Sequence, residues 1–400
     1  YQEKYRLEKR KSAKVFHDAL VAFAERRIII MKIAMLGHKR IPSREGGVEI
    51  VVEELTTRMA ALGHQVVAYN RKGKHVSDKS CTTLQKKEYK GVKIVQVPTI
   101  DKKGLNALIY SVLASVHAVF GKYDVLHYHA EGSCAMIWLP KLFGIHTVAT
   151  IHGLDWQRAK WGGFATKYLK FGEKMAAKKA DQLIVLSKNM QRYFMDTYGR
   201  ETVYIPNGLT MPEKKEVSII RERFNLEKNS YILFLARIVP EKGVHYLIKA
   251  FKKCNTDKKL VIAGGSSHSA EYYQKIAQFA KTDSRILMTG FVQGDVLEEL
   301  YSNCSLYVLP SDVEGMPISL LEAMAYGRRC LVSDIPENME LAGEHAVSFQ
   351  QGNIEDLQEK LQQLIEQSDT EQTENTTYVA NNFNWDTIVE KTLKLYEKGC

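Results

Sequence analysis

Short apolar runs alternate with amphipathic helical patterns from residue 31 onward. The runs are nearly continuous in hydrophobicity, which is typical of parallel strands that are buried on both faces. Helical patterns such as 48–62 and 164–180 lie between them. In the first half of the chain the predicted strands are 32–36, 65–69, 93–97, 124–128, 147–151, 182–186 and 202–205.

The alternation restarts after the turn sequence Pro206-Asn207-Gly208. Here the predicted helices include 246–254, 295–301 and an amphipathic segment, 385–398, that follows a polar run. The predicted strands are 231–235, 260–263, 285–288, 306–309, 330–333 and 346–349. Two such series predict an α/β chain with two facing Rossmann-like domains, each a doubly wound parallel sheet. Ligands bind beyond the carboxyl ends of such strands, so we expect a cleft between the domains.

The length of 400 residues also favours two domains over one. We expect a basic, helix-prone extension at 1–30, which is an added segment or fusion remnant, because Met31 opens the first strand. The first Rossmann-like domain is predicted at 31–208 and the second at 209–378. A C-terminal helix in 379–400 is expected to pack back on the first domain.

The formal net charge of +10 changes this picture only slightly. A basic surface attracts phosphates, acidic lipid headgroups or nucleic acid, although solubility alone explains such a charge equally well. No recognised nucleic-acid-binding motif is present, so no nucleic-acid partner is expected. The six cysteines include no C-x-x-C pair and predict reduced thiols in a cytoplasmic protein. No stretch of about 18 uninterrupted apolar residues predicts a membrane span.

Two cations follow the first predicted strand of the second domain. Arg237 and Lys242 lie in the sequence Ala236–Gly243, directly after 231–235. Cations at the carboxyl end of a strand point into the expected cleft, where they can hold a diphosphate. Taken alone the signal is weak, because a lone arginine or lysine in a loop is more often a solvated charge.

The run Glu314-Gly-Met-Pro-Ile-Ser-Leu-Leu-Glu322-Ala-Met-Ala is more specific. Pro317 is predicted as the first helical residue, so Gly315 and Met316 present backbone N–H groups at a helix N-terminus, which is an anion site. Glu314 lies just before this helix and Glu322 within it, and both can border one pocket. Carboxylates that hold no metal suit sugar hydroxyls, which donate hydrogen bonds to them. The alternative is a capping acid and a surface glutamate.

Glycine turns support the same reading. Gly264 ends one strand and permits close backbone approach, and Val292 follows another strand at a position where it can line a base pocket. In the first domain, Gly46 and Gly47 open a helix after the first strand, where a ligand phosphate can approach. Ordinary tight turns between strand and helix remain the alternative for each.

Histidines mark the ends of two strands in the first domain. His152 follows 147–151 at a strand end, where a lone histidine is more often structural, and Asp155 is a weak candidate for binding an acceptor. His127 and His129 alternate on one strand and therefore share a face. Zinc is conceivable there, but no acid or cysteine completes a ligand set, so no metal site is predicted. Packing at the strand end or an acceptor-binding role for His129 is favoured.

These motifs, in this order, resemble the retaining glycosyltransferases of family four with the GT-B fold. The resemblance covers about 31–400 and depends most on the run from Glu314 to Gly327. The segments 46–55 and 334–341 resemble capsule and cell-wall rhamnosyltransferase-like enzymes. One departure is Arg329, where relatives usually carry proline before the next strand.

The resemblance implies that Arg237 and Lys242 bind the diphosphate of a nucleotide-sugar donor. Glu314 then touches the transferred sugar, Glu322 binds the ribose hydroxyls, and His152 lies near the transferred sugar. It also implies transfer with retention, without a metal or other cofactor, to a glycan or a polyprenyl-diphosphate-linked acceptor. Surface-polysaccharide or glycoconjugate synthesis is the expected setting, for a monomer or dimer in the cytoplasm.

A basic and apolar region of the first domain predicts contact with an anionic membrane at the inner face of the plasma membrane. Aromatic residues begin the helix 164–180, an apolar helix spans 104–120, and a solvated helix face is the alternative. The lysines concerned are Lys102, Lys103, Lys160, Lys167, Lys170, Lys174, Lys178 and Lys179. Two other functions stay open: a nucleotide-sugar epimerase of the same fold, and a non-catalytic protein that binds sugar nucleotides.

Overall fold

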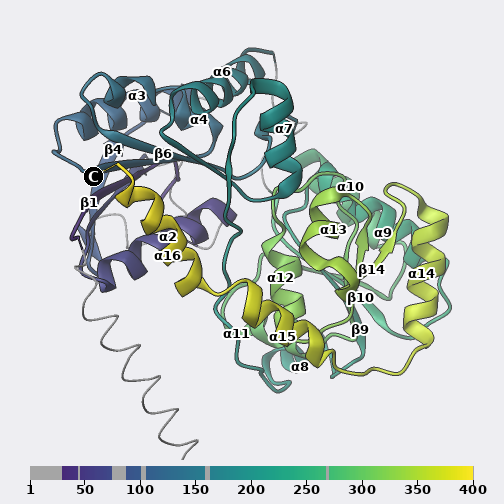
Figure 1. The fold of residues 1–400 in the computed structure, drawn as a ribbon. Helices are drawn as coiled ribbons and strands as arrows, with labels where there is room; N and C mark the ends of the chain where they lie inside the picture. The colour runs from purple at the N-terminus through teal and green to yellow at the C-terminus, as the bar shows by residue number, and fades with distance from the viewer. Residues whose placement is uncertain are drawn as a thin grey trace, which may run out of the picture.

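The computed structural model describes residues 29–43, 46–73, 87–100, 105–157, 163–266 and 270–399. Most of the expected extension at 1–30 lies outside the described residues, as do Lys102, Lys103 and Lys160. The two predicted sheets are both present, and they lie in separate α/β domains (Figure 1). The fold class predicted from the alternating pattern is therefore confirmed.

The first sheet has eight strands in the order β3-β4-β2-β1-β5-β6-β7-β8. All neighbouring strands are parallel except β3, which pairs antiparallel with β4. In chain order the strands are β1 (Lys32–Leu36), β2 (Gln65–Lys72), β3 (Glu88–Tyr89), β4 (Val92–Pro98), β5 (Val125–His129), β6 (His146–Ile151), β7 (Gln182–Val185) and β8 (Val203–Tyr204). The sequence pattern missed only β3, because two residues are too few to show a period.

The second sheet has six parallel strands in the order β11-β10-β9-β12-β13-β14. They are β9 (Tyr231–Leu235), β10 (Lys259–Ala263), β11 (Ile286–Gly290), β12 (Leu306–Leu309), β13 (Cys330–Ser333) and β14 (Val347–Phe349). Each lies within one or two residues of its predicted position. The switch in strand order falls between β9 and β12, so loops after these two strands border the same ligand-binding crevice.

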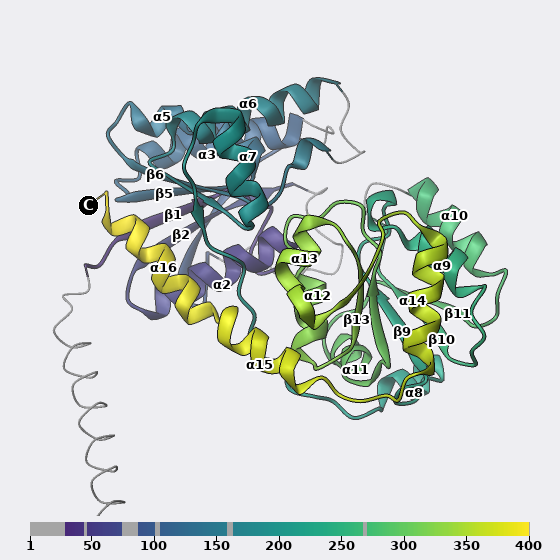
Figure 2. The same ribbon diagram turned by 45° about the vertical axis from the view of Figure 1, so that its right-hand side comes forward.

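Helices cover both faces of each sheet (Figures 1 and 2). In the first domain they are α2 (Gly47–Ala61), α3 (Leu105–Val119), α4 (Glu131–Cys134), α5 (Trp138–Lys141), α6 (Gly163–Lys179) and α7 (Lys188–Tyr198). In the second they are α8 (Ile219–Phe224), α9 (Val244–Phe251), α10 (Ala270–Ala280), α11 (Asp295–Asn303), α12 (Ile318–Ala325), α13 (Pro336–Ala342) and α14 (Ile354–Glu366). The buried apolar residues form two clusters per domain, one on each side of the sheet.

The chain ends with α15 (Thr373–Asn382) and α16 (Trp385–Glu397), which return from the second domain to the first (Figure 2). Trp385, Ile388 and Tyr396 of α16 are buried in the same cluster as residues of α2 and β1. The Tyr396 hydroxyl lies 2.6 Å from Nδ1 of His127 on β5. The final helix therefore covers one face of the first sheet, and the chain crosses between the domains twice.

Two local predictions differ from the structure. Pro317 is not the first helical residue: it has an extended backbone, with φ of −76° and ψ of 94°, and α12 begins at Ile318. Proline supplies the right φ for a helix, but its ψ is set by the chain that enters the turn. The polar run before the last helix contains α15, whose polar composition hid a buried seam formed by Asn375 and Val379.

Candidate functional site

The carboxyl ends of the second sheet face the first domain at Gly315. A Cβ on this glycine would collide with the carbonyl oxygen of His152, which follows β6. Gly47, at the start of α2, lies against Ile318, because a Cβ on it would be 3.4 Å from the Ile318 Cδ1. Gly315 is needed for close approach rather than for a turn, whereas Gly47 is in ordinary van der Waals contact. They bring the loops of the two domains into direct contact beside the N-terminus of α12.

Lys242 and Glu314 form an ion pair at this edge. Lys242 ends a short 3₁₀ turn, Pro240–Lys242, after β9, and Glu314 lies in the loop after β12. The Ser311 hydroxyl donates to the same carboxylate oxygen of Glu314 at 2.7 Å. Only 13% of the lysine side chain and 7% of the glutamate side chain are exposed. A charged pair this sheltered is held in one geometry by its hydrogen bonds.

Gly243 explains how the loop after β9 reaches Glu314. It has φ of +67°, and a Cβ there would collide with the carbonyl oxygen of Pro310. Asp312 N–H donates to the Glu241 carbonyl at 2.9 Å and ties the two loops together. Arg237 lies directly after β9 in the same loop and is half-buried. The two cations predicted from the sequence are thus both at the carboxyl end of β9.

Glu322 is held inside α12 by a residue that sequence reasoning did not find. The Tyr301 hydroxyl, from the end of α11, donates to Glu322 Oε2 at 2.9 Å and lies 3.2 Å from the Ser319 carbonyl. Burial, together with the charge of Glu322, raises the pKa of Tyr301 well above its usual value. Tyr301 is therefore a permanent donor that fixes one oxygen of this carboxylate.

The loops after β9, β10 and β11 lie side by side. Gly264, with φ of +156°, is pressed against the Ala236 carbonyl, where a Cβ would collide. A Cβ on Gly265 would be 3.4 Å from that of Phe291, the residue after β11. The Phe291 ring is 57% exposed, and Val292 beside it is half-buried. An exposed aromatic ring at the carboxyl edge of a sheet is a surface on which a flat base can stack.

Three imidazoles are close together in the first domain. His127 and His129 share one face of β5, with ring centroids 4.1 Å apart, as their alternation predicts. His129 Nδ1 lies 3.0 Å from His152 Nε2, so one of these two nitrogens carries the shared proton. The sequence did not indicate this link, because β5 and β6 become neighbours only in the folded sheet.

Burial keeps the two inner imidazoles neutral. Desolvation, and then the His152 imidazole, lowers the pKa of His127 to about 3. Desolvation and the three neighbouring histidines, among them His38, lower the pKa of His129 well below its usual value. A neutral His129 has one donor and one acceptor nitrogen, so it orients His152 without adding charge.

A buried acidic group beside these histidines is a second feature that sequence reasoning missed. Glu131 follows β5 and is fully buried, and burial, with the charges of Asp155 and Glu173, raises its pKa to about 10. Glu173 accepts hydrogen bonds from Trp156 at 2.8 Å, Tyr193 at 2.8 Å and Tyr198 at 2.5 Å. The raised pKa makes Glu131 a buried carboxyl group that stays neutral.

The interface between the domains includes a second set of contacts. The Glu340 carboxylate of α13 accepts from the backbone N–H groups of Lys188 at 2.6 Å and Asn189 at 3.3 Å. It therefore caps the N-terminus of α7, where the helix dipole favours an anion. Glu337 accepts from the Asn189 amide at 3.1 Å. These bonds hold α13 against α7 on the side of the interface away from α2.

The described residues contain no group of three or more His, Cys, Asp or Glu side chains that is arranged to hold a metal ion. Within the same residues, no helix is long and apolar enough to span a membrane. Four of the cysteines are buried free thiols. The site is thus built from carboxylates, cations, imidazoles and backbone groups, which suit an anionic and hydroxyl-rich ligand.

Comparison with known proteins extends this reading. Residues 45–211 match the glycosyltransferase family 4 model, and residues 216–397 match the model for glycosyl transferases group 1. An uncharacterised glycosyltransferase of Methanocaldococcus jannaschii is 25% identical over 88% of this chain and 95% of its own length. An N,N'-diacetylbacillosaminyl-diphospho-undecaprenol alpha-1,3-N-acetylgalactosaminyltransferase of Campylobacter jejuni is 28% identical over 46% of this chain and 49% of its own.

Among solved structures, the Anabaena protein HepE in complex with UDP and glucose superposes with a TM-score of 0.75. It covers 92% of this chain and 100% of its own at 17% identity, which supports the fold alone. The two family matches together span both domains, and they meet at the first crossing between them. The chain is therefore a group 1 glycosyltransferase of the GT-B fold, with a family 4 first domain.

Proposed function

We propose that the protein transfers a sugar, with retention and without a metal ion, from a nucleotide-diphosphate sugar to a glycan linked to a lipid diphosphate. The observation that carries this proposal is the sheltered Lys242–Glu314 pair, which lies beside the contact between His152 and Gly315. A donor bound between these groups has its diphosphate near a cation and its sugar near a carboxylate and an imidazole. The acceptor approaches from the first domain.

The diphosphate is bound by Arg237 and Lys242 at the end of β9. The backbone N–H groups of Gly315 and Met316, just before α12, add dipoles aimed at the same charge. Lys242 is paired with Glu314, so a bound diphosphate would share the ammonium group with this carboxylate. These groups stabilise the negative charge that develops on the leaving diphosphate, the contribution that is usually largest in such transfers.

The sugar and the nucleoside have separate partners. Glu314 accepts hydrogen bonds from hydroxyls of the transferred sugar, and His152, oriented by His129, lies on its other side. Glu322, held by Tyr301, accepts from the ribose hydroxyls. Gly46, Gly47 and Gly264 let the backbone approach the ligand, and Val292 and Phe291 border the base.

The reaction breaks the bond between the sugar C1 and the diphosphate oxygen. The acceptor oxygen forms its bond to C1 on the same face, and its proton passes to the departing phosphate oxygen. Atoms and charge balance without a protein nucleophile or a metal. Asp155 is partly exposed and is the candidate to position the acceptor hydroxyl, whereas Glu131 and His129 are fully buried and can act only through neighbouring groups.

The Campylobacter relative is named for a diphospho-undecaprenol acceptor, and HepE was solved with UDP. We therefore propose a UDP-sugar as the first donor to test and a membrane-borne acceptor. The segments 46–55 and 334–341 resemble rhamnosyltransferase-like enzymes, so dTDP-rhamnose is the second donor to test. Raised unfolding midpoints identify the donor, because a ligand that binds only the folded chain stabilises it.

The product then tests the reaction. The selected donor is incubated with lipid-diphosphate acceptors in EDTA, and the anomeric configuration of the product is read by NMR. Transfer with retention is expected. Inverted product, or turnover that returns only with added metal, would contradict the mechanism. A new nucleotide sugar formed without acceptor would favour the epimerase alternative.

The proposal includes membrane attachment through the outer face of α6. Phe164 is 74% exposed and Phe171 47% exposed, at the spacing that puts them on one side of the helix. Three lysines, Lys167, Lys170 and Lys174, are exposed between and beside them. Apolar rings with interleaved cations suit a surface of anionic headgroups and acyl chains.

Vesicle sedimentation tests this attachment. The protein is expected to bind vesicles of anionic phospholipid at low salt and to ignore zwitterionic ones. The double variant Phe164→Ser, Phe171→Ser should lose most of the binding, whereas Lys281→Ala, an exposed lysine on the second domain, should keep it. Equal binding by all three proteins would rule this face out.

A further inference from the structure

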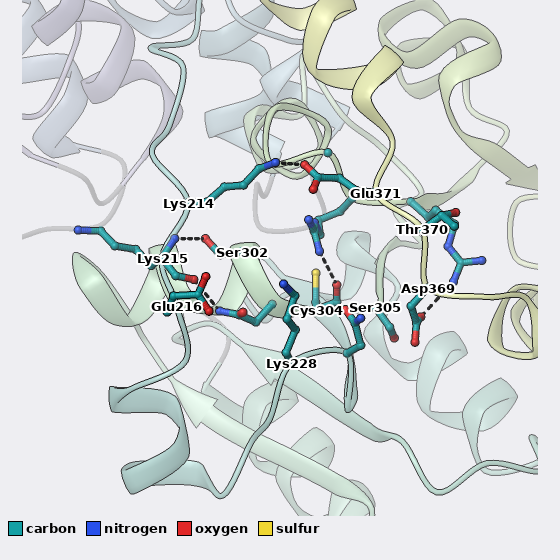
Figure 3. A pocket seen from close by; sticks show the side chains of 15 residues that line it. Lys214, Lys215, Glu216, Lys228, Ser302, Cys304, Ser305, Asp369, Thr370 and Glu371 are labelled. Carbon is teal, nitrogen blue, oxygen red and sulfur yellow. Dashed lines mark hydrogen bonds and ion pairs between the residues drawn. The ribbon is translucent and has the colours of Figure 1, made fainter.

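A cavity lies at the opposite end of the second sheet from the proposed donor site. It is lined by residues that precede β9, β12 and β13, among them Lys228, Ser305 and Arg329, and its volume is about 240 Å³. Arg237 and Lys242, by contrast, follow the carboxyl end of β9. The cavity therefore lies at the amino ends of the strands and is separate from the site described above (Figure 3).

Both crossings between the domains form its walls. Lys214–Glu216 belong to the first crossing, and Asp369–Glu371 to the segment that leads into α15 (Figure 3). Lys214 and Glu371 form an ion pair between the two segments. The Lys215 N–H donates to the Ser302 hydroxyl at 2.9 Å. These bonds hold the walls in place, so the cavity is a built feature of the fold.

Two cations at the cavity have no acid to balance them. Arg328 is 8% exposed and donates only to backbone carbonyls, those of Tyr326 at 3.1 Å and Cys304 at 3.3 Å. Within the described part of the chain, neither Arg328 nor Lys228 has a carboxylate partner. Figure 3 shows Lys228 extending between the two wall segments.

Two of the three acids at the cavity, Asp369 and Glu371, are paired with cations, and the third, Glu216, is exposed to solvent. Asp369 accepts from Lys258 at 2.8 Å and from Arg329 at 3.3 Å, so one carboxylate serves two cations. The Arg329 Nε is buried without a hydrogen-bond partner. Burial, and then the positive charges of Arg328 and Lys228, lower the pKa of Lys214. The electrostatic potential in the cavity is therefore positive. Binding of an anion there would lower the free energy of the folded protein.

Size and lining define the class of anion. The volume of about 240 Å³ is below the range of roughly 300–1,000 Å³ that is usual for drug-sized ligands. The lining consists of charged, polar and small residues, with no aromatic ring on which a base could stack. A phosphate group with at most one small hydroxylated unit fits these limits, and Asn229, Ser302 and Thr370 can bond its hydroxyls.

We propose that this cavity binds a small phosphate ester, with the phosphate between Lys228 and Arg328. Lys214 and Arg329 complete the charged surround. Arg329 is the position at which the sequence departs from the usual proline of the family, and the departure supplies a cation to the cavity. The occupant is either free phosphate or a sugar phosphate, which share the same charged group.

Thermal unfolding of the full chain tests the proposal. Saturating UDP is present throughout, so that a phosphate bound at the donor site does not contribute. Inorganic phosphate and glucose 1-phosphate are titrated separately, with sodium chloride added to keep the ionic strength constant. A saturable rise in the unfolding midpoint is expected. A rise with both probes identifies the phosphate group as sufficient, and a rise with glucose 1-phosphate alone shows that the sugar is needed.

Matched variants assign the effect to the cavity. Lys228→Ala removes one charge-assisted hydrogen bond and should raise the half-saturating concentration about tenfold or more. Lys228→Glu should abolish the effect. Lys281→Ala, which removes an exposed lysine elsewhere in the domain, should leave it unchanged. No saturable rise, or equal rises in all variants, would overturn the proposal whether or not the donor site binds UDP.

Discussion

The two domains present different kinds of polar group at their interface. The second domain presents charged groups in pairs, such as Lys242 with Glu314. The first presents buried groups that stay neutral, such as His129 and Glu131. A charged pair can exchange its internal partner for a diphosphate, whereas neutral donors and acceptors can orient a hydroxyl without repelling it. The difference fits the proposal that the second domain binds the anionic donor and the first domain receives the acceptor hydroxyl.

Removing a cation from the second domain should have the largest effect. Lys242→Ala is expected to lower turnover by about 10²–10³-fold, because it removes a charge that stabilises the leaving diphosphate. Arg237→Ala should act similarly. The measurement is kcat with the donor identified above, with circular dichroism as the control for folding. Turnover within a few-fold of normal in a folded variant would remove these residues from the site.

Substitution of Glu173 should destabilise the fold more than substitution of Glu131. Glu173→Gln leaves Trp156, Tyr193 and Tyr198 facing an amide instead of a carboxylate, so it should destabilise the fold by about 1–3 kcal/mol. Glu131→Gln replaces a neutral carboxyl by a neutral amide of the same shape and should cost much less at pH 7. Urea unfolding of both variants measures the difference. Equal losses would mean that Glu131 is ionised.

The pH dependence of stability sharpens the same point. In the unfolded chain Glu131 loses its proton near 4.5, but in the folded chain it keeps the proton up to about 10. Because the folded state binds the extra proton between these values, this group makes the protein less stable as pH rises through that window. Glu131→Gln should therefore lose less stability than the parent chain between pH 6 and 9. Parallel curves for the two proteins would contradict the assignment.

The smallest expected effect is at Tyr301. Tyr301→Phe removes one hydrogen bond to Glu322 and leaves the ring in place. KM for the donor should rise by several-fold, the equivalent of about 1 kcal/mol, with kcat little changed, since the ribose does not react. Steady-state kinetics separate the two constants. A fall in kcat with unchanged KM would place Glu322 at the reacting sugar instead.

Local sequence patterns predict most of the secondary structure of this protein. All strands except β3 follow from nearly continuous apolar runs, since a strand buried on two faces has few polar positions. Arg237, Lys242 and Glu314 were predicted as site residues because they lie in loops after strands, and Glu322 because it lies in the helix after Glu314. The helix α15 was missed because its apolar positions are too few to show a period, and only its packing against α12 buries them.

What the sequence by itself determined is the family, the two-domain α/β fold and the residues that flank the strands. The tertiary structure decided which of these residues meet. Lys242 and Glu314 are joined only because β9 and β12 are neighbours in the sheet, and His129 and His152 only because β5 and β6 are. Charge balance was likewise invisible in the sequence, because it depends on distances across the fold. The neutral Glu131 and the cationic cavity at Lys228 both arise from groups brought together from distant parts of the chain.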